Sequence, residues 1–133
     1  MSDARVLDSW ALLCYLEKES GFEKIIQVFE EAVNDFQPLL MTVINWGEVY
    51  YQVVRRYGDD RAREIEQLIG SFPIVLVDID LNLTREAALL KATKKMAYAD
   101  CFAAALAKQR QAELYTGDPE FKSVEKEIKI RWL

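Results

Sequence analysis

Hydrophobic residues follow two patterns along the chain, short continuous runs and longer stretches with helical spacing. The continuous runs predict buried strands at residues 4–8, 39–42, 74–77 and 114–116. Hydrophobic positions three and four residues apart predict helices through residues 11–16, 22–33, 43–57, 60–71, from 80 or 82 to about 94, and from about 98 to 111. Near the C-terminus, Ile128, Ile130 and Trp132 alternate with Lys129 and Arg131, which predicts an edge strand with one solvent-facing side.

Strands that alternate with helices indicate a parallel sheet covered on both faces. We therefore expect an α/β protein, with a three-layer α/β/α, doubly wound, mainly parallel sheet of about five strands. No internal repeat, low-complexity tract or linker divides the chain, so residues 1–133 are expected to form a single domain. In sheets of this kind the functional site lies beyond the carboxyl ends of the strands, where the strand order reverses.

Four carboxylates occupy that edge of the predicted sheet. Asp8 ends the first strand, and Asp118 closely follows the fourth. Glu48 and Asp100 lie in the first turns of helices, which begin at the same edge. Carboxylates brought together repel one another unless a cation joins them, and hard cations such as Mg²⁺ and Mn²⁺ prefer oxygen ligands. The pattern therefore favours metal-dependent phosphodiester chemistry.

Each of these carboxylates also has a structural explanation. Asp8 before a helix is a plausible N-cap, and Asp118 followed by Pro119 is typical of a cap with proline at the first helical position. Asp100 in a first turn would complement the helix dipole, and Glu48 lies at capping-box spacing from Asn45. Position and residue type alone leave the capping and catalytic interpretations open.

The amino-acid composition excludes some catalytic mechanisms and limits others. The chain contains no histidine, which excludes imidazole ligands and histidine acid–base catalysis. Cys14 and Cys101 are isolated, and we interpret them as reduced core thiols of a cytoplasmic protein. The formal net charge of −5 opposes nonspecific binding to nucleic acid, although two bound divalent cations would offset four of these charges.

Localisation follows from what the sequence lacks. No apolar stretch approaches the roughly 18 residues of a membrane span, so we expect no membrane association. The first residues contain no basic segment followed by an apolar one, so no secretion signal is expected. Together these features predict a cytoplasmic protein.

The segments around the four carboxylates resemble the PIN domain family, and most closely its VapC-like toxins from bacterial and archaeal toxin–antitoxin pairs. These segments occur in the family's order and spacing. They are VLDSWALL at residues 6–13, INWGEVYY at 44–51, YADCFAAA at 98–105 and TGDPEF at 116–121. One departure is Gly117, which stands where many relatives carry asparagine.

The resemblance implies an endoribonuclease that depends on one or two Mg²⁺ or Mn²⁺ ions, on a sheet with strand order 3-2-1-4-5. It assigns catalysis and metal binding to Asp8, Glu48, Asp100 and Asp118, and auxiliary polar roles to Ser9, Asn45 and Thr116. It also implies an RNA substrate, a homodimer and a small antitoxin partner. Two alternatives stay open: a PIN nuclease of RNA maturation or decay without an antitoxin, and a noncatalytic α/β binding module with an acidic pocket.

Contacts with RNA or an antitoxin are less defined by the sequence. Basic side chains that could meet phosphates, or simply be solvated, are Arg55, Arg56, Lys91, Lys94, Lys95 and Lys122. Trp10 and Trp46 could stack on a base or pack into the core. If an antitoxin binds, Tyr15, Phe22 and Tyr51 could line its groove, although the sequence pattern alone assigns them to the core.

Overall fold

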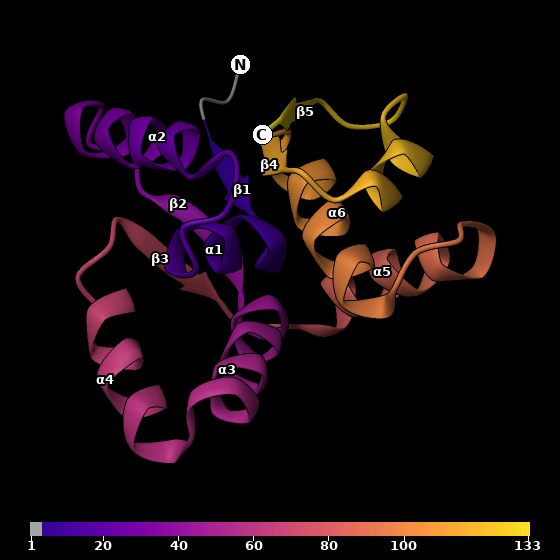
Figure 1. Cartoon of the computed structure of the whole chain (residues 1–133). Helices are drawn as coiled ribbons and strands as arrows, with labels where there is room; N and C mark the ends of the chain where they lie inside the picture. The colour runs from indigo at the N-terminus through magenta and orange to yellow at the C-terminus, as the bar shows by residue number, and fades with distance from the viewer. Residues whose placement is uncertain (1–3) are drawn as a thin grey trace.

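The computed structural model describes residues 4–133 and consists of a five-stranded sheet between two layers of helices (Figure 1). The strands are β1 (Arg5–Leu7), β2 (Leu39–Thr42), β3 (Ile74–Val77), β4 (Glu113–Thr116) and β5 (Ile130–Trp132). The helices are α1 (Ser9–Leu16), α2 (Phe22–Asn34), α3 (Val43–Tyr57), α4 (Asp59–Ile69), α5 (Leu81–Thr93), α6 (Tyr98–Arg110) and the 3₁₀ helix η1 (Pro119–Val124).

All neighbouring strands pair in parallel, in the order β3-β2-β1-β4-β5. Val6 at the centre of β1 aligns with Leu40 of β2 on one side and Leu114 of β4 on the other. The chain moves outward from β1 to β3 and then returns to start β4 on the other side of β1. The predicted α/β class and the strand order 3-2-1-4-5 are therefore confirmed, and the reversal point lies between β1 and β4.

Two hydrophobic cores lie on the two faces of the sheet. Helices α1 to α4 cover one face, where Leu7, Met41 and Tyr115 meet their buried side chains. Helices α5 and α6, with η1, cover the other face around Val6 and Leu114. Within α6, the alanines from position 103 to 107 are fully buried, because small side chains let the helix lie close to the sheet.

The start of β5 follows from a specific hydrogen bond. The expected C-terminal strand begins at Ile130 and not at Ile128, because the Ile128 N–H donates to the Val124 carbonyl oxygen and closes a turn after η1.

Cys14 and Cys101 are buried free thiols, as expected for core residues. No helix within residues 4–133 is both long and apolar enough to cross a membrane.

Candidate metal centre at the carboxyl edge of the sheet

Asp8 directly follows β1 and is completely buried. Its Oδ1 accepts a hydrogen bond from the Ala11 N–H at 2.9 Å, which makes it the N-cap of α1. Its Oδ2 accepts a hydrogen bond of 2.5 Å from the Thr116 hydroxyl at the end of β4. The capping interpretation is therefore correct for Asp8, and the second oxygen also joins the two strands at the reversal point.

Thr116 links Asp8 to the turn that carries Asp118. The Thr116 hydroxyl, which donates to Asp8, accepts a hydrogen bond from the Asp118 N–H at 3.0 Å. Asp118 in turn caps η1, since its Oδ1 accepts from the Glu120 N–H at 2.9 Å. A single buried threonine thus fixes the position of both aspartates.

Ser9 and Asn45 join three helices beneath the site. The Asn45 side-chain amide donates to the Ala99 carbonyl oxygen in α6 at 3.1 Å and to the Ser9 hydroxyl in α1 at 3.3 Å. The Ser9 hydroxyl donates to the Asn45 carbonyl oxygen in α3 at 3.0 Å. Thr42, whose Oγ1 caps α3, donates to the Asn45 Oδ1 at 2.5 Å. These buried groups hold the starts of α1, α3 and α6 together.

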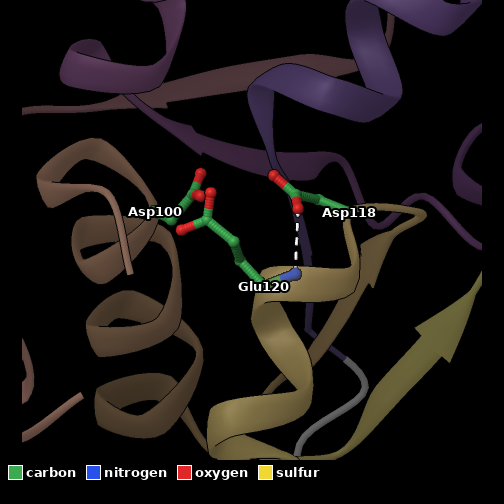
Figure 2. Close-up of side chains that lie close together, drawn as sticks. All are labelled: Asp100, Asp118 and Glu120. Atoms are coloured by element: carbon green, nitrogen blue, oxygen red, sulfur yellow. Dashed lines mark hydrogen bonds between the residues drawn. The ribbon is translucent and has the colours of Figure 1, made fainter. Parts of the chain in front are cut away.

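Three carboxylates converge near the starts of α6 and η1. Oxygens of Asp100, Asp118 and Glu120 lie within 4.8 Å of one another. Figure 2 shows the Asp100 and Glu120 carboxylates pointing toward each other from α6 and η1, with Asp118 beside them. Glu120 spans the gap between these elements, because its Oε1 also accepts from the Ala97 N–H at 2.7 Å. The structure therefore brings Asp100 and Asp118 together as the sequence predicted.

Glu120 is the acidic residue that the sequence reasoning did not assign. It lies two residues after Asp118, in the first turn of η1. The sequence signal that could have identified Glu120 was its closeness to Asp118, just after the C-terminal end of a predicted strand. Glu48 and Asp8 lie outside the tightest group, but the charges of both raise the pKa of Asp100. All five carboxylates thus share one electrostatic environment.

Burial and neighbouring negative charges raise the pKa values of two aspartates at the site. Burial raises the pKa of Asp8 to about 7, with added contributions from Asp118 and Glu48, although the hydrogen bonds from Thr116 and Ala11 oppose the shift. Burial, followed by the charges of Asp118, Asp8, Glu120 and Glu48, raises the pKa of Asp100 to about 8. A bound cation would relieve this repulsion, and a set of oxygen donors suits Mg²⁺ or Mn²⁺.

The other residues singled out in the sequence have varied surroundings. Trp46 stacks on Tyr50 with ring centroids 5.0 Å apart, and Tyr15 packs against Phe29 and Phe72 in the core. Phe22 is partly buried against the same core. Arg56 is paired with Glu17, Lys94 with Glu127, and Lys91 donates to the Met96 carbonyl oxygen. Several of the proposed phosphate contacts are therefore engaged within the protein.

Comparison with known proteins identifies the family. A sequence model of the PIN domain matches residues 5–127. DNA-bound VapBC from Salmonella typhimurium has a chain 17% identical, with a TM-score of 0.76 and 98% of each chain covered. VapBC2 from Rickettsia felis, bound to a promoter DNA fragment, is 12% identical, with a TM-score of 0.75 and the same coverage.

A third solved structure is VapC20 of Mycobacterium tuberculosis, described as a toxin that cleaves the sarcin–ricin loop. It is 12% identical, with a TM-score of 0.69, and the match covers 91% of this chain and 95% of that one. At such identities the similarity establishes the fold. No curated protein sequence matches significantly.

Proposed function

This chain belongs to the PIN domain family, a family of nucleases, and we propose that it is a metal-dependent endoribonuclease acting as the toxin of a toxin–antitoxin pair. The observation that carries the proposal is the convergence of Asp100, Asp118 and Glu120 beside buried Asp8. Within residues 4–133, none of these carboxylates forms an ion pair with lysine or arginine. A cation is therefore the partner that would complete the cluster.

In this proposal Asp100, Asp118 and Glu120, together with Asp8, would hold one or two Mg²⁺ or Mn²⁺ ions. Half-buried Glu48 would bind a metal or orient the attacking water. When bound, the ion supplies positive charge for the transition state and lowers the pKa of water at the site. Thr116 keeps Asp8 in place during the reaction through its hydrogen bond. The attacking water loses a proton as its oxygen bonds to phosphorus. The bond from phosphorus to the 3′ oxygen breaks, and that oxygen takes up a proton from solvent, so that one water molecule is consumed.

A cleavage assay tests the proposal directly. RNA would be incubated with the protein in Mg²⁺ or Mn²⁺, in EDTA, and with Asp100→Asn or Glu120→Gln. We expect cleavage to products with 5′-phosphate and 3′-hydroxyl ends with the wild type, and a loss of at least about 100-fold with EDTA or either variant. The matched control is Glu64→Gln, which alters an exposed carboxylate on α4 paired with Arg61.

The outcomes separate the alternatives. Equal cleavage in every tube would indicate a contaminating nuclease and contradict the assignment. Metal binding without cleavage of any RNA would favour the noncatalytic acidic-pocket module. Cleavage without growth arrest on expression would favour a PIN nuclease of RNA maturation or decay.

The biological part of the proposal concerns partners. Neighbours with this fold include VapBC complexes, which supports a small antitoxin for this chain. We propose that the protein acts in the cytoplasm as a homodimer, and that a short neighbouring reading frame encodes the antitoxin. Co-expression of that product should relieve growth arrest caused by the toxin. Unchanged arrest with every adjacent product would contradict the antitoxin assignment.

A further inference from the structure

One strip along a face of α3 leads away from the acidic site, and its side chains are partly or fully exposed. Glu48, Tyr51, Gln52 and Arg55 are spaced by three, four and seven residues, so they share one face of the helix. Figure 1 shows α3 starting at the carboxyl edge of the sheet and running outward from it with α4. Seven residues of helix place Arg55 about 10 Å beyond Glu48 along the axis. A few nucleotides of a strand bound at the carboxylates would cover that distance.

Arg55 differs from the basic groups around it. Its guanidinium lies over the Tyr51 ring, 5.0 Å from the centroid, and it forms no ion pair within the described part of the chain. The neighbouring Arg56 is paired with Glu17. Tyr51 is 46% exposed, and together with Gln52 and both arginines it lines an open hollow of about 330 Å³. An arginine that an aromatic ring holds in place, and that has no carboxylate partner within the described residues, can bind an anion.

The chemistry of this strip matches a nucleic-acid strand. The guanidinium fork can donate two parallel hydrogen bonds to a phosphate, and an exposed tyrosine ring can stack on a base. Stacking on a side chain requires a base that is free of its duplex neighbours, which favours single-stranded RNA. Because the chain has a net charge of −5 and five carboxylates line the site, a strand entering it needs a positive contact nearby.

We propose that Arg55 and Tyr51 form a contact for single-stranded RNA beside the cleavage site. Arg55 binds a backbone phosphate, and Tyr51 stacks on a base a few nucleotides from the bond that is cut. This inference rests on the proposed ribonuclease function and adds to it two residues that bind the strand. It also distinguishes Arg55 from the other basic side chains, several of which are engaged within the protein.

Binding is best measured without cleavage, in an Asp100→Asn background with Mg²⁺ present. The probe is a fluorescently labelled single-stranded RNA, and its dissociation constant is measured by anisotropy from 50 to 200 mM salt. We expect Arg55→Gln to weaken binding about fivefold or more and to reduce the slope of log K against log salt by about 0.7, the loss of one phosphate contact. Tyr51→Ala should weaken binding by about fivefold or more and leave the salt slope unchanged.

The matched control is Arg61→Gln, which removes an exposed arginine from α4 that is paired with Glu64. It should change neither the dissociation constant nor the slope. If the dissociation constants of Arg55→Gln and Arg61→Gln are equal, the proposal is overturned. If Tyr51→Ala weakens the binding of duplex RNA of the same sequence as much as it weakens the binding of single-stranded RNA, the stacking contact is contradicted. Melting temperatures of all variants confirm that they fold.

Cleavage by proteins with an intact Asp100 separates this inference from the proposed function. If the wild type cuts no RNA with Mg²⁺ or Mn²⁺, the ribonuclease assignment fails. If the wild type cuts and Arg55→Gln cuts with the same KM, only the Arg55 contact is wrong. If Arg55→Gln retains RNA binding but loses binding to a co-purified antitoxin, the strip is a protein-docking surface and the RNA contact is likewise wrong.

Discussion

At the scale of single residues, Gly117 has a physical reason that the family resemblance did not provide. A Cβ built on Gly117 would lie 2.2 Å from one atom of the Trp10 ring and 2.5 Å from two others. The indole ring therefore occupies the space that any side chain at position 117 would need. Trp10 lies against the turn that carries Asp118, and this packing explains why position 117 is glycine.

We predict that Gly117→Ala lowers the free energy of unfolding by about 1–3 kcal/mol, because the added methyl group overpacks against Trp10. In a Trp10→Ala background the same substitution should lower the free energy of unfolding by less, because the clashing ring is absent. Urea unfolding of the two single variants and the double variant measures this coupling. Equal costs in both backgrounds would show that the ring does not restrict position 117.

Some residues of the candidate site could be predicted from the sequence, and others could not. Asp8 and Asp118 were found because each follows a strand, and parallel strands end at one edge. Glu120 was missed because its role depends on reaching Ala97, 23 residues earlier, across the space between η1 and α6. The pairing of Arg56 with Glu17 likewise joins α3 to the end of α1, which no local pattern reports.

At the scale of elements, α6 begins without a side-chain cap although it carries Asp100. Its N-cap residue, Ala97, has an extended backbone with φ −60° and ψ 147° and makes no side-chain cap hydrogen bond. The Ala97 N–H is bound by Glu120, but the N–H groups of the first turn lack the usual side-chain acceptor. When Asp100 is ionised, its negative charge in the third helical position complements the positive end of the helix dipole.

We predict that Ala97→Ser stabilises the protein by about 1 kcal/mol, because the serine hydroxyl can accept from the N–H of Ala99 or Asp100 in the existing backbone geometry. Thermal unfolding in EDTA measures the change. Ala88→Ser, in the exposed middle of α5, is the matched control and should lower stability slightly through helix propensity. A loss of stability with Ala97→Ser would mean that α6 is capped in another way.

Hydrophobic spacing predicted the existence and approximate bounds of the helices and strands, because each buries one face. Spacing could not give the order of the strands, which came from the family resemblance. The position of β5 also escaped the pattern. Ile128 is buried and in phase with Ile130, yet its N–H closes a turn with Val124 before the strand begins.

At the scale of the whole molecule, the carboxylate cluster makes stability depend on pH. The pKa values of Asp8 and Asp100 are raised to about 7 and about 8 in the folded protein, from 3.8 in an unperturbed aspartate. Between about pH 4 and pH 8 the folded protein therefore holds more protons on these groups than the unfolded chain does. These two groups lower the free energy of unfolding as the pH rises through that interval, because they ionise while buried and close to other carboxylates.

We predict that, in EDTA, the urea midpoint is higher at pH 5 than at pH 8. Millimolar Mn²⁺ should raise the midpoint more at pH 8, because the ion binds ionised carboxylates in the folded state and offsets the repulsion that appears there. Asp100→Asn removes one of the two titrating groups, so it should flatten the pH dependence in EDTA and reduce the response to Mn²⁺. A midpoint in EDTA that increases from pH 5 to pH 8 would contradict the raised pKa values. An equal effect of Mn²⁺ on the wild type and on Asp100→Asn would show that the ion stabilises the protein elsewhere, and would remove the physical basis for a metal centre at this edge of the sheet.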